Sequence, residues 1–173
     1  DYEDMLAEAC KDPLGAVTGP YSSIRSGFES ALAALDAAQS TVPPSDWLAG
    51  RRGIPINGLI WMGDKATMRA RIAEKLDAGF RVLKLKIGGI AFDDELELLR
   101  EVRRSFSRSD LEIRLDANGA FTHANALSRL SALSVFGIHS LEQPVKAGQV
   151  AEMARICLES PIPIALDEEL IGV

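Results

Sequence analysis

Short apolar runs alternate with longer amphipathic stretches over most of the chain after residue 54. Five runs predict strands, at residues 54–61, 81–86, 111–116, 138–142 and 162–167. Four stretches between them have the apolar spacing of helices, and they begin near Asp64, Asp93, Thr122 and Gly148. This alternation predicts successive βα units and therefore a parallel sheet.

Charged residues within the runs favour a closed barrel over an open sheet. Lys84 and Lys86 alternate with Leu83 and Leu85, and the next run alternates in the same way up to Asp116. A central strand of an open sheet is covered on both faces and tends to be apolar throughout, whereas a barrel strand can point charges into the barrel mouth. We therefore predict an α/β fold in which five strands form part of a (β/α) barrel.

Residues 1–50 have a different pattern and are predicted to form a separate unit. A helix is expected after the serine pair at 22–23, because its apolar residues follow one stripe: Ile24, Phe28, Leu32 and Leu35. Two prolines at 43–44 cannot continue a helix. A boundary is thus expected within residues 40–53, which gives domains at 1–50 and 51–173.

The composition is that of an ordinary globular protein, and the charge restricts its partners. Hydrophobic residues make up 47% of the chain, and 19 basic against 25 acidic residues give a net charge of -6. An acidic chain is poorly suited to neutralising nucleic-acid phosphates. The apolar runs are too short to cross a membrane, and no secretion signal or cysteine framework is visible. A cytoplasmic location is expected.

A charged side chain ends four consecutive runs. Lys86, Asp116, Glu142 and Asp167 follow one another at spacings of 30, 26 and 25 residues, each about one βα unit. A single acid at a strand end is commonly solvated or ion-paired. Three acids on consecutive strands would repel one another unless a cation lay between them, and oxygen ligands suit Mg²⁺, with Mn²⁺ as an alternative. We therefore predict a metal site at the carboxyl-terminal rim.

The strings around these residues resemble the muconate-lactonizing-enzyme branch of the enolase superfamily. They are Lys84-Leu85-Lys86, Leu115-Asp116-Ala117-Asn118, Leu141-Glu142-Gln143-Pro144 and Ala165-Leu166-Asp167-Glu168. Within this branch, residues 55–63 and 164–170 resemble o-succinylbenzoate synthases of menaquinone biosynthesis. The resemblance implies the first five strands of the family's barrel, preceded by the helical end of an α+β capping domain.

The same resemblance implies a reaction and roles for the charged residues. The reaction is a syn dehydration by a carbon–oxygen lyase of a small carboxylate, 2-succinyl-6-hydroxy-2,4-cyclohexadiene-1-carboxylate, to 2-succinylbenzoate. Asp116, Glu142 and Asp167 would bind Mg²⁺. Lys86 would remove the proton α to the carboxylate and then assist the loss of hydroxide. Lys84 would be an electrostatic neighbour, although an ion pair with a nearby acid explains it equally well.

Several alternatives stay open from the sequence. The family's later strands and its second catalytic lysine would lie beyond residue 173, so we expect the chain to be part of a longer enzyme. A muconate cycloisomerase, an N-acylamino acid racemase or a dipeptide epimerase would share these site residues. Outside the enzymes, the chain could be a non-catalytic barrel fragment that binds a partner chain. The oligomeric state is not indicated, Gly88-Gly89 predicts a tight turn, and His139 is predicted to face the helices.

Overall fold

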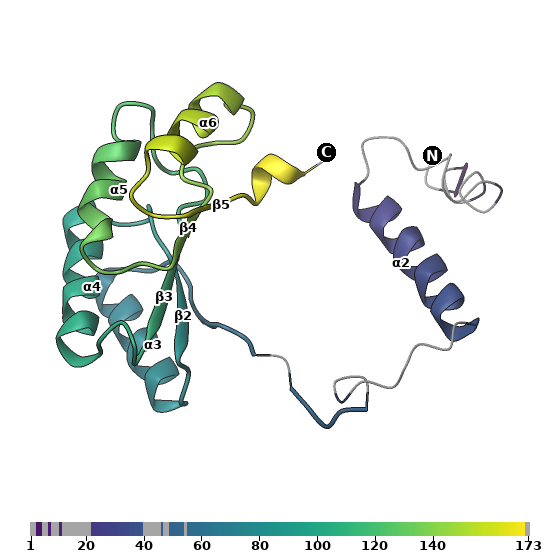
Figure 1. The fold of residues 1–173 in the computed structure, drawn as a ribbon, viewed down its shortest axis with the longest axis horizontal. Coiled ribbons are helices and arrows are strands. Elements are labelled where there is room, and N and C mark those ends of the chain that lie inside the picture. Colours follow the sequence, from purple (N-terminus) through teal and green to yellow (C-terminus); the bar gives the residue numbers. More distant parts are fainter. Residues whose placement is uncertain are drawn as a thin grey trace. The chain divides into compact units, whose positions relative to one another are not determined.

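The structure is a computed structural model that describes residues 3, 4, 7, 11, 22–39, 46, 49–53 and 55–171. It divides into two compact units, of which one comprises Asp1–Ile54 and Ile171–Val173 and the other Pro55–Leu170. The first unit contains helix α2, Ser22–Gln39, where the apolar stripe predicted a helix (Figure 1). Phe28 and Leu32 on that stripe are half-buried, but Leu35 is exposed, so the stripe is not buried along its whole length.

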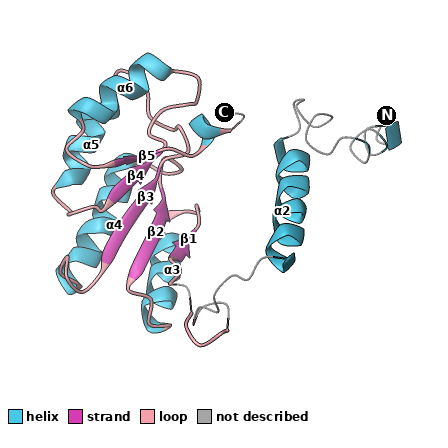
Figure 2. Ribbon diagram, turned by 45° about the vertical axis from the view of Figure 1, so that its right-hand side comes forward, coloured by secondary structure: helices cyan, strands magenta, loops and turns pink. Residues whose placement is uncertain are grey.

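The second unit is a parallel sheet of five strands in the order β1-β2-β3-β4-β5. The strands are β1 Gly58–Ile60, β2 Val82–Lys86, β3 Glu112–Asp116, β4 Ser140–Glu142 and β5 Ile164–Ala165. The helices between them are α3 Lys65–Asp77, α4 Phe92–Ser105, α5 Ala126–Ser134 and α6 Val150–Glu159, and a 3₁₀ turn η1, Glu168–Leu170, follows β5. Figure 2 shows these helices on one side of the sheet. This arrangement confirms the predicted partial (β/α) barrel.

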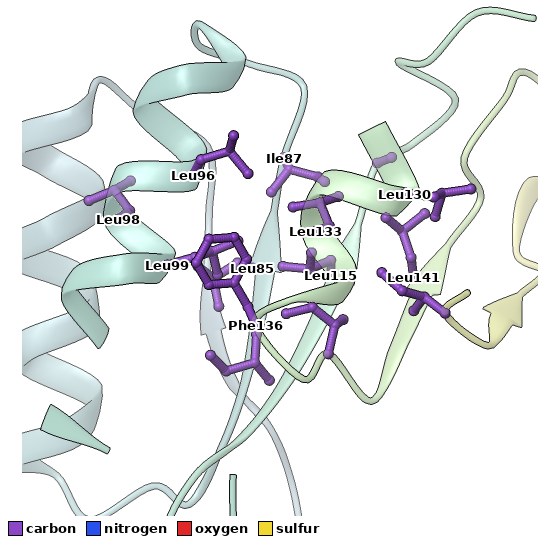
Figure 3. Packing of buried hydrophobic residues seen from close by; sticks show 14 of the residues in the cluster. Leu85, Ile87, Leu96, Leu98, Leu99, Leu115, Leu130, Leu133, Phe136 and Leu141 are labelled. Carbon is purple, nitrogen blue, oxygen red and sulfur yellow. The ribbon is translucent and has the colours of Figure 1, made fainter. Parts of the chain in front are cut away.

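The alternation of apolar and charged residues along the strands explains which face of the sheet is buried. Leu83 and Leu85 are 0% and 2% exposed and point toward the helices, while Lys84 and Lys86 point the other way and stay partly accessible. Leucines of α4 and α5 pack onto the apolar side of β2, β3 and β4 (Figure 3). The core therefore lies between sheet and helices, which leaves the opposite side of the sheet free for charged groups. None of the described helices is both long and apolar enough to cross a membrane.

Some predicted bounds were wrong. The fifth strand ends at Ala165, two residues before the predicted end at 167. Helix α5 begins at Ala126 and not near Thr122, because the Asn125 side chain accepts the Thr122 N–H at 2.8 Å and residues 122–125 form a turn. His139, which was predicted to face the helices, is exposed. It precedes the first residue of β4, so the alternation of the strand does not extend to it.

Candidate active site

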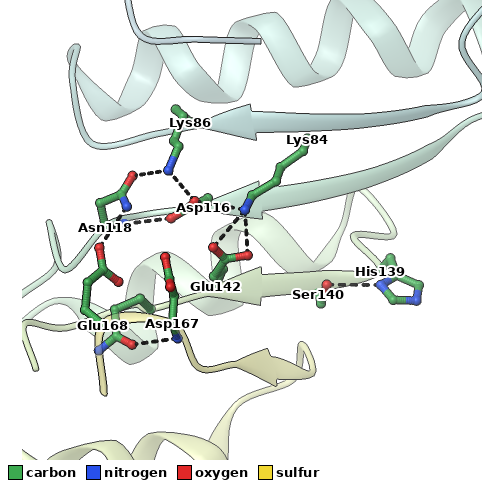
Figure 4. A network of polar contacts seen from close by, with 10 residues as sticks. Lys84, Lys86, Asp116, Asn118, His139, Ser140, Glu142, Asp167 and Glu168 are labelled. Carbon is green, nitrogen blue, oxygen red and sulfur yellow. Dashed lines mark hydrogen bonds and ion pairs between the residues drawn. The ribbon is translucent and has the colours of Figure 1, made fainter. Parts of the chain in front are cut away.

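The strand register brings three of the predicted site residues level with one another. Lys86 of β2 pairs with Asp116 of β3, and Asp116 pairs with Glu142 of β4. Each of these residues is the last of its strand. Because the strands are parallel, their side chains meet at the carboxyl-terminal edge of the sheet, on the side away from the helices (Figure 4).

Two lysines and two acids form a connected cluster at this edge. Lys86 Nζ donates to Asp116 Oδ2 at 2.5 Å and to Asn118 Oδ1 at 2.8 Å. Lys84 Nζ donates to both carboxylate oxygens of Glu142 at 2.7 Å, and it lies 3.1 Å from Asp116 Oδ2. Asp116 itself is fully buried. The ion pair that the sequence left open for Lys84 is therefore formed with Glu142 and Asp116.

Burial and charge pairing act in opposite directions on these groups. Burial, the largest influence, raises the pKa of Asp116, but hydrogen bonds from Lys86 and from the Asn118 N–H outweigh it and bring the pKa below its usual value. For Lys84 burial also acts most strongly and favours the neutral amine, yet Glu142 and Asp116 raise the pKa of this lysine overall. Burial raises the pKa of Glu142, and Lys84 offsets this only in part. In the cluster, the positive charges of Lys84 and Lys86 therefore balance the negative charges of Asp116 and Glu142.

Asp167 lies apart from this cluster. It lies two residues beyond the end of β5 and is exposed, and its N–H donates to Gln143 Oε1 at 3.2 Å. Figure 4 shows its side chain pointing toward the carboxylates of Asp116 and Glu142. Within residues 55–171 and the other described positions, no three His, Cys, Asp or Glu side chains are close enough together to hold a metal ion. A shared metal at Asp116, Glu142 and Asp167 therefore stays a prediction.

Comparison with known proteins places the chain in a family. Residues 67–173 match the model of enolase C-terminal domain-like proteins. The chain belongs to this enolase family. An o-succinylbenzoate synthase from Desulfotalea psychrophila is 51% identical over 156 residues, which are 90% of this chain and 42% of that relative. The chain thus spans less than half of that enzyme's length.

Solved structures of the enolase family agree with this placement. The crystal structure of MenC from Desulfotalea psychrophila superposes with a TM-score of 0.67 at 42% identity, over 98% of this chain and 52% of that one. A dipeptide epimerase from Cytophaga hutchinsonii, solved with Mg and the dipeptide D-Ala-L-Val, has a TM-score of 0.60 at 25% identity. That match covers 66% of this chain and 31% of the epimerase.

The donor set at the sheet edge fits the divalent cation of an enolase-family site. Asp116, Glu142 and Asp167 offer only oxygen atoms, as Mg²⁺ prefers. Beside them, Glu168 Oε1 accepts a hydrogen bond from the Asn118 side chain at 2.9 Å. Its other carboxylate oxygen, Oε2, is buried without a hydrogen-bond partner among the described residues. In this structure, the two lysines supply the positive charge that the acids require.

Trp61 was not predicted to belong to the site. Trp61 follows β1, and Lys86 Nζ lies 5.5 Å from the centroid of its ring, within cation–π range. Trp61, Lys84, Lys86 and Arg114 line one cavity of about 560 Å³. The position of Trp61 at the end of the first apolar run, matching that of Lys86 in the second, was the available signal.

Two residues beside the acids adopt a backbone conformation that is rare for residues other than glycine. Asn118 has φ 43° and Gln143 has φ 41°, both in the left-handed region. Such conformations cost of order 1–3 kcal/mol, persist where the surroundings hold them, and cluster at active sites. Both residues stood in the quoted strings, but no local pattern indicated their conformation.

Proposed function

We propose that the full-length protein carrying this chain is an o-succinylbenzoate synthase. Its reaction would be the dehydration of 2-succinyl-6-hydroxy-2,4-cyclohexadiene-1-carboxylate to 2-succinylbenzoate. The observation that supports this function best is the 51% identity to the Desulfotalea psychrophila o-succinylbenzoate synthase over 156 residues. The dipeptide epimerase, which has a related fold, is 25% identical.

Asp116, Glu142 and Asp167 would hold a divalent cation, by analogy with the Mg in the epimerase structure. The bound ion would supply positive charge that stabilises the negative charge developing on the substrate carboxylate. With their carboxylates engaged as ligands, Asp116 and Glu142 would no longer serve as counter-charges for the lysines. A lysine acts as a base only as the neutral amine, and nearby positive charge favours that form.

Lys86 is the side chain best placed to move the proton. It ends β2 at the rim, borders the cavity beside Trp61, and contacts Asp116 directly. The Lys86 amine would take the proton from the carbon α to the carboxylate, and the electron pair of that C–H bond would move toward the carboxylate. The Lys86 ammonium would then give this proton to the leaving hydroxyl as its C–O bond breaks. Water leaves, the ring becomes aromatic, and Lys86 is neutral again.

A substrate comparison with the full-length protein tests this function. With Mg²⁺ present, the cyclohexadiene carboxylate should be converted to 2-succinylbenzoate with a kcat/KM of about 10⁴ M⁻¹s⁻¹ or more, the lower end for enzymes acting on their own substrates. Dipeptides, N-acylamino acids and muconate are the comparison substrates, because the enzymes of the family that act on them would share these site residues. Faster turnover of any of these, with slow dehydration, would assign the protein to another activity of the family.

A further inference from the structure

The side chain of Gln143 connects the ends of two neighbouring strands. Gln143 directly follows Glu142 at the end of β4 and is fully buried. Its Oε1 accepts the backbone N–H groups of Asp167 and Glu169, each at 3.2 Å. Its Nε2 donates to the Val145 carbonyl at 2.9 Å and to Glu169 Oε2 at 3.3 Å. Both ends of the amide are therefore used, and they join the segment after β4 to the segment after β5.

The Gln143 backbone makes two further connections at the same place. Its N–H donates to the Ala165 carbonyl of β5 at 3.0 Å, and its carbonyl accepts the Gly119 N–H at 2.8 Å. Segments that follow β3, β4 and β5 thus meet at this one residue. Its left-handed φ of 41° is a conformation that the surrounding contacts must hold in place.

Asp167 depends on Gln143 because it belongs to neither a strand nor a helix. Strand β5 ends at Ala165, and the 3₁₀ turn begins at Glu168. The backbone of Asp167 is fixed through its N–H, which Gln143 accepts, and through its carbonyl, which accepts the Leu170 N–H at 2.9 Å. Gln143 is joined by a peptide bond to Glu142, so the same residue sets the positions of both neighbouring acids.

We propose that Gln143 is a positioning residue that fixes the separation of the Glu142 and Asp167 carboxylates so that both can bind one divalent cation. This role rests on the metal site of the proposed function, and it assigns to Gln143 no contact with the substrate. Residues that hold metal ligands in place typically change metal affinity or activity by 10- to 100-fold when they are replaced.

The test is a Mn²⁺ titration of the full-length protein in which electron paramagnetic resonance measures the bound Mn²⁺. Gln143→Met keeps the length of the side chain but removes its four side-chain hydrogen bonds. It should weaken Mn²⁺ binding by about 10- to 100-fold. Gln149→Met is the matched control. Gln149 is exposed and its side chain donates to the Lys146 carbonyl at 3.0 Å, so the same change there should leave Mn²⁺ binding within about twofold of the wild type.

A second measurement keeps the inference testable if Gln143→Met does not fold. In the wild-type protein, the Asp167 and Glu169 amide hydrogens should exchange with solvent at least about a hundredfold more slowly than in an unstructured peptide, because both are donated to a buried acceptor. In Gln143→Asn, which is shorter by one methylene group, both should exchange faster while the Leu141 amide, bonded to the Pro163 carbonyl at 2.9 Å, stays protected. Rapid exchange of both amides in the wild type would overturn the inference.

The outcomes separate this inference from the proposed reaction. Mn²⁺ binding by Gln143→Met as tight as that of the wild type would show that Gln143 only stabilises the fold, and the inference would be wrong. Wild-type protein that binds Mn²⁺ but does not dehydrate the cyclohexadiene carboxylate would refute the reaction and leave the role of Gln143 intact. Wild-type protein that binds no Mn²⁺ would overturn both.

Discussion

At the scale of single residues, Lys84 and Lys86 share one face of β2 but have different surroundings. Lys86 is the last residue of the strand and contacts Asn118 and the Trp61 ring, whereas Lys84 lies two residues deeper and is bound by Glu142. Lys86 is therefore nearer the rim, where substrates of barrel enzymes bind. This difference supports the proposal that Lys86, and not Lys84, transfers the proton.

A buried acid on α4 organises the loop that follows Lys86. Glu95 is 2% exposed, and its Oε1 accepts the Gly88 N–H at 2.5 Å. Burial raises the pKa of Glu95, although the backbone N–H groups of Gly88 and Ile90 oppose this. The loop directs these amides at a carboxylate of the same chain, which agrees with the predicted tight turn.

Glu95→Gln tests this interpretation through the pH dependence of stability. The usual pKa is near 4.5, and the folded protein holds the Glu95 proton to higher pH than the unfolded chain does. The unfolded state therefore releases the proton first, and Glu95 lowers stability increasingly as the pH rises from 4.5 to the folded pKa. In urea unfolding from about pH 4 to about pH 8, the stability of Glu95→Gln relative to wild type should grow with pH. A pH-independent difference would contradict the raised pKa.

Glu152 is a control, because its pKa is shifted in the direction opposite to that of Glu95. Arg155 and His123 lower the pKa of Glu152 to about 2. These pairs therefore add stability that is present above about pH 4.5 and is lost as the pH falls toward 2. Glu152→Gln should be less stable than wild type near neutral pH, with the deficit shrinking below pH 4.5. The same pH trend for both variants would mean that a general charge effect, and not the local surroundings, decides the result.

At the scale of elements, the loops after β2 and β3 touch at one glycine. Gly88 has a φ of +88°, and a Cβ placed on it would lie 2.3 Å from the Cβ of Ala120. Gly79 has nearly the same φ, +86°, but no described atom outside its chain neighbours lies within 4 Å of the position that a Cβ would take there. An alanine at position 79 therefore tests backbone strain alone, whereas an alanine at position 88 tests backbone strain together with the contact between the two loops.

Gly79→Ala should lose roughly 1–2 kcal/mol of unfolding free energy, the usual strain of alanine in the left-handed region. Gly88→Ala should lose clearly more, because Ala120 must also move. Chemical denaturation of both variants measures the difference. Equal losses would mean that the two loops do not pack against each other as the structure has them.

The sequence predicted the elements where a local pattern determines them. Alternation along β2 and β3 indicated which side of the sheet carries Lys86 and Asp116, and the register confirmed that both lie at one edge. The position of Asp167 could not be predicted in the same way. It lies beyond the end of β5 and is held by Gln143, a contact across 24 residues of chain that no local spacing encodes.

At the scale of the whole molecule, the sheet has two edge strands, β1 and β5, while its interior strands carry the charged cluster. Relatives of the enolase family are longer, since the chain spans 42% of the o-succinylbenzoate synthase and 52% of the MenC structure. The proposed activity and metal site are therefore properties to be measured on the full-length protein.

Metal binding should stabilise the full-length protein by mass action. A ligand that binds only the folded state adds about 2.7 kcal/mol at a hundred times its Kd. The melting temperature should therefore rise with Mg²⁺, and Asp167→Asn should abolish most of this rise because one ligand is lost. Asp93→Asn, at an exposed acid of α4, is the control and should keep it. An equal rise in both variants would exclude Asp167 as a ligand.

The most direct measurement of the central claim is the turnover of the cyclohexadiene carboxylate by full-length Lys86→Ala with Mg²⁺ present. A positioned general base contributes about 10² to 10⁴ in rate, so turnover should fall by about 10²-fold or more. Mn²⁺ binding and thermal unfolding should stay close to wild type. Lys86→Arg should be equally inactive, because a guanidinium remains protonated. A folded, metal-binding Lys86→Ala protein that dehydrates the substrate within about tenfold of the wild-type rate would contradict the account.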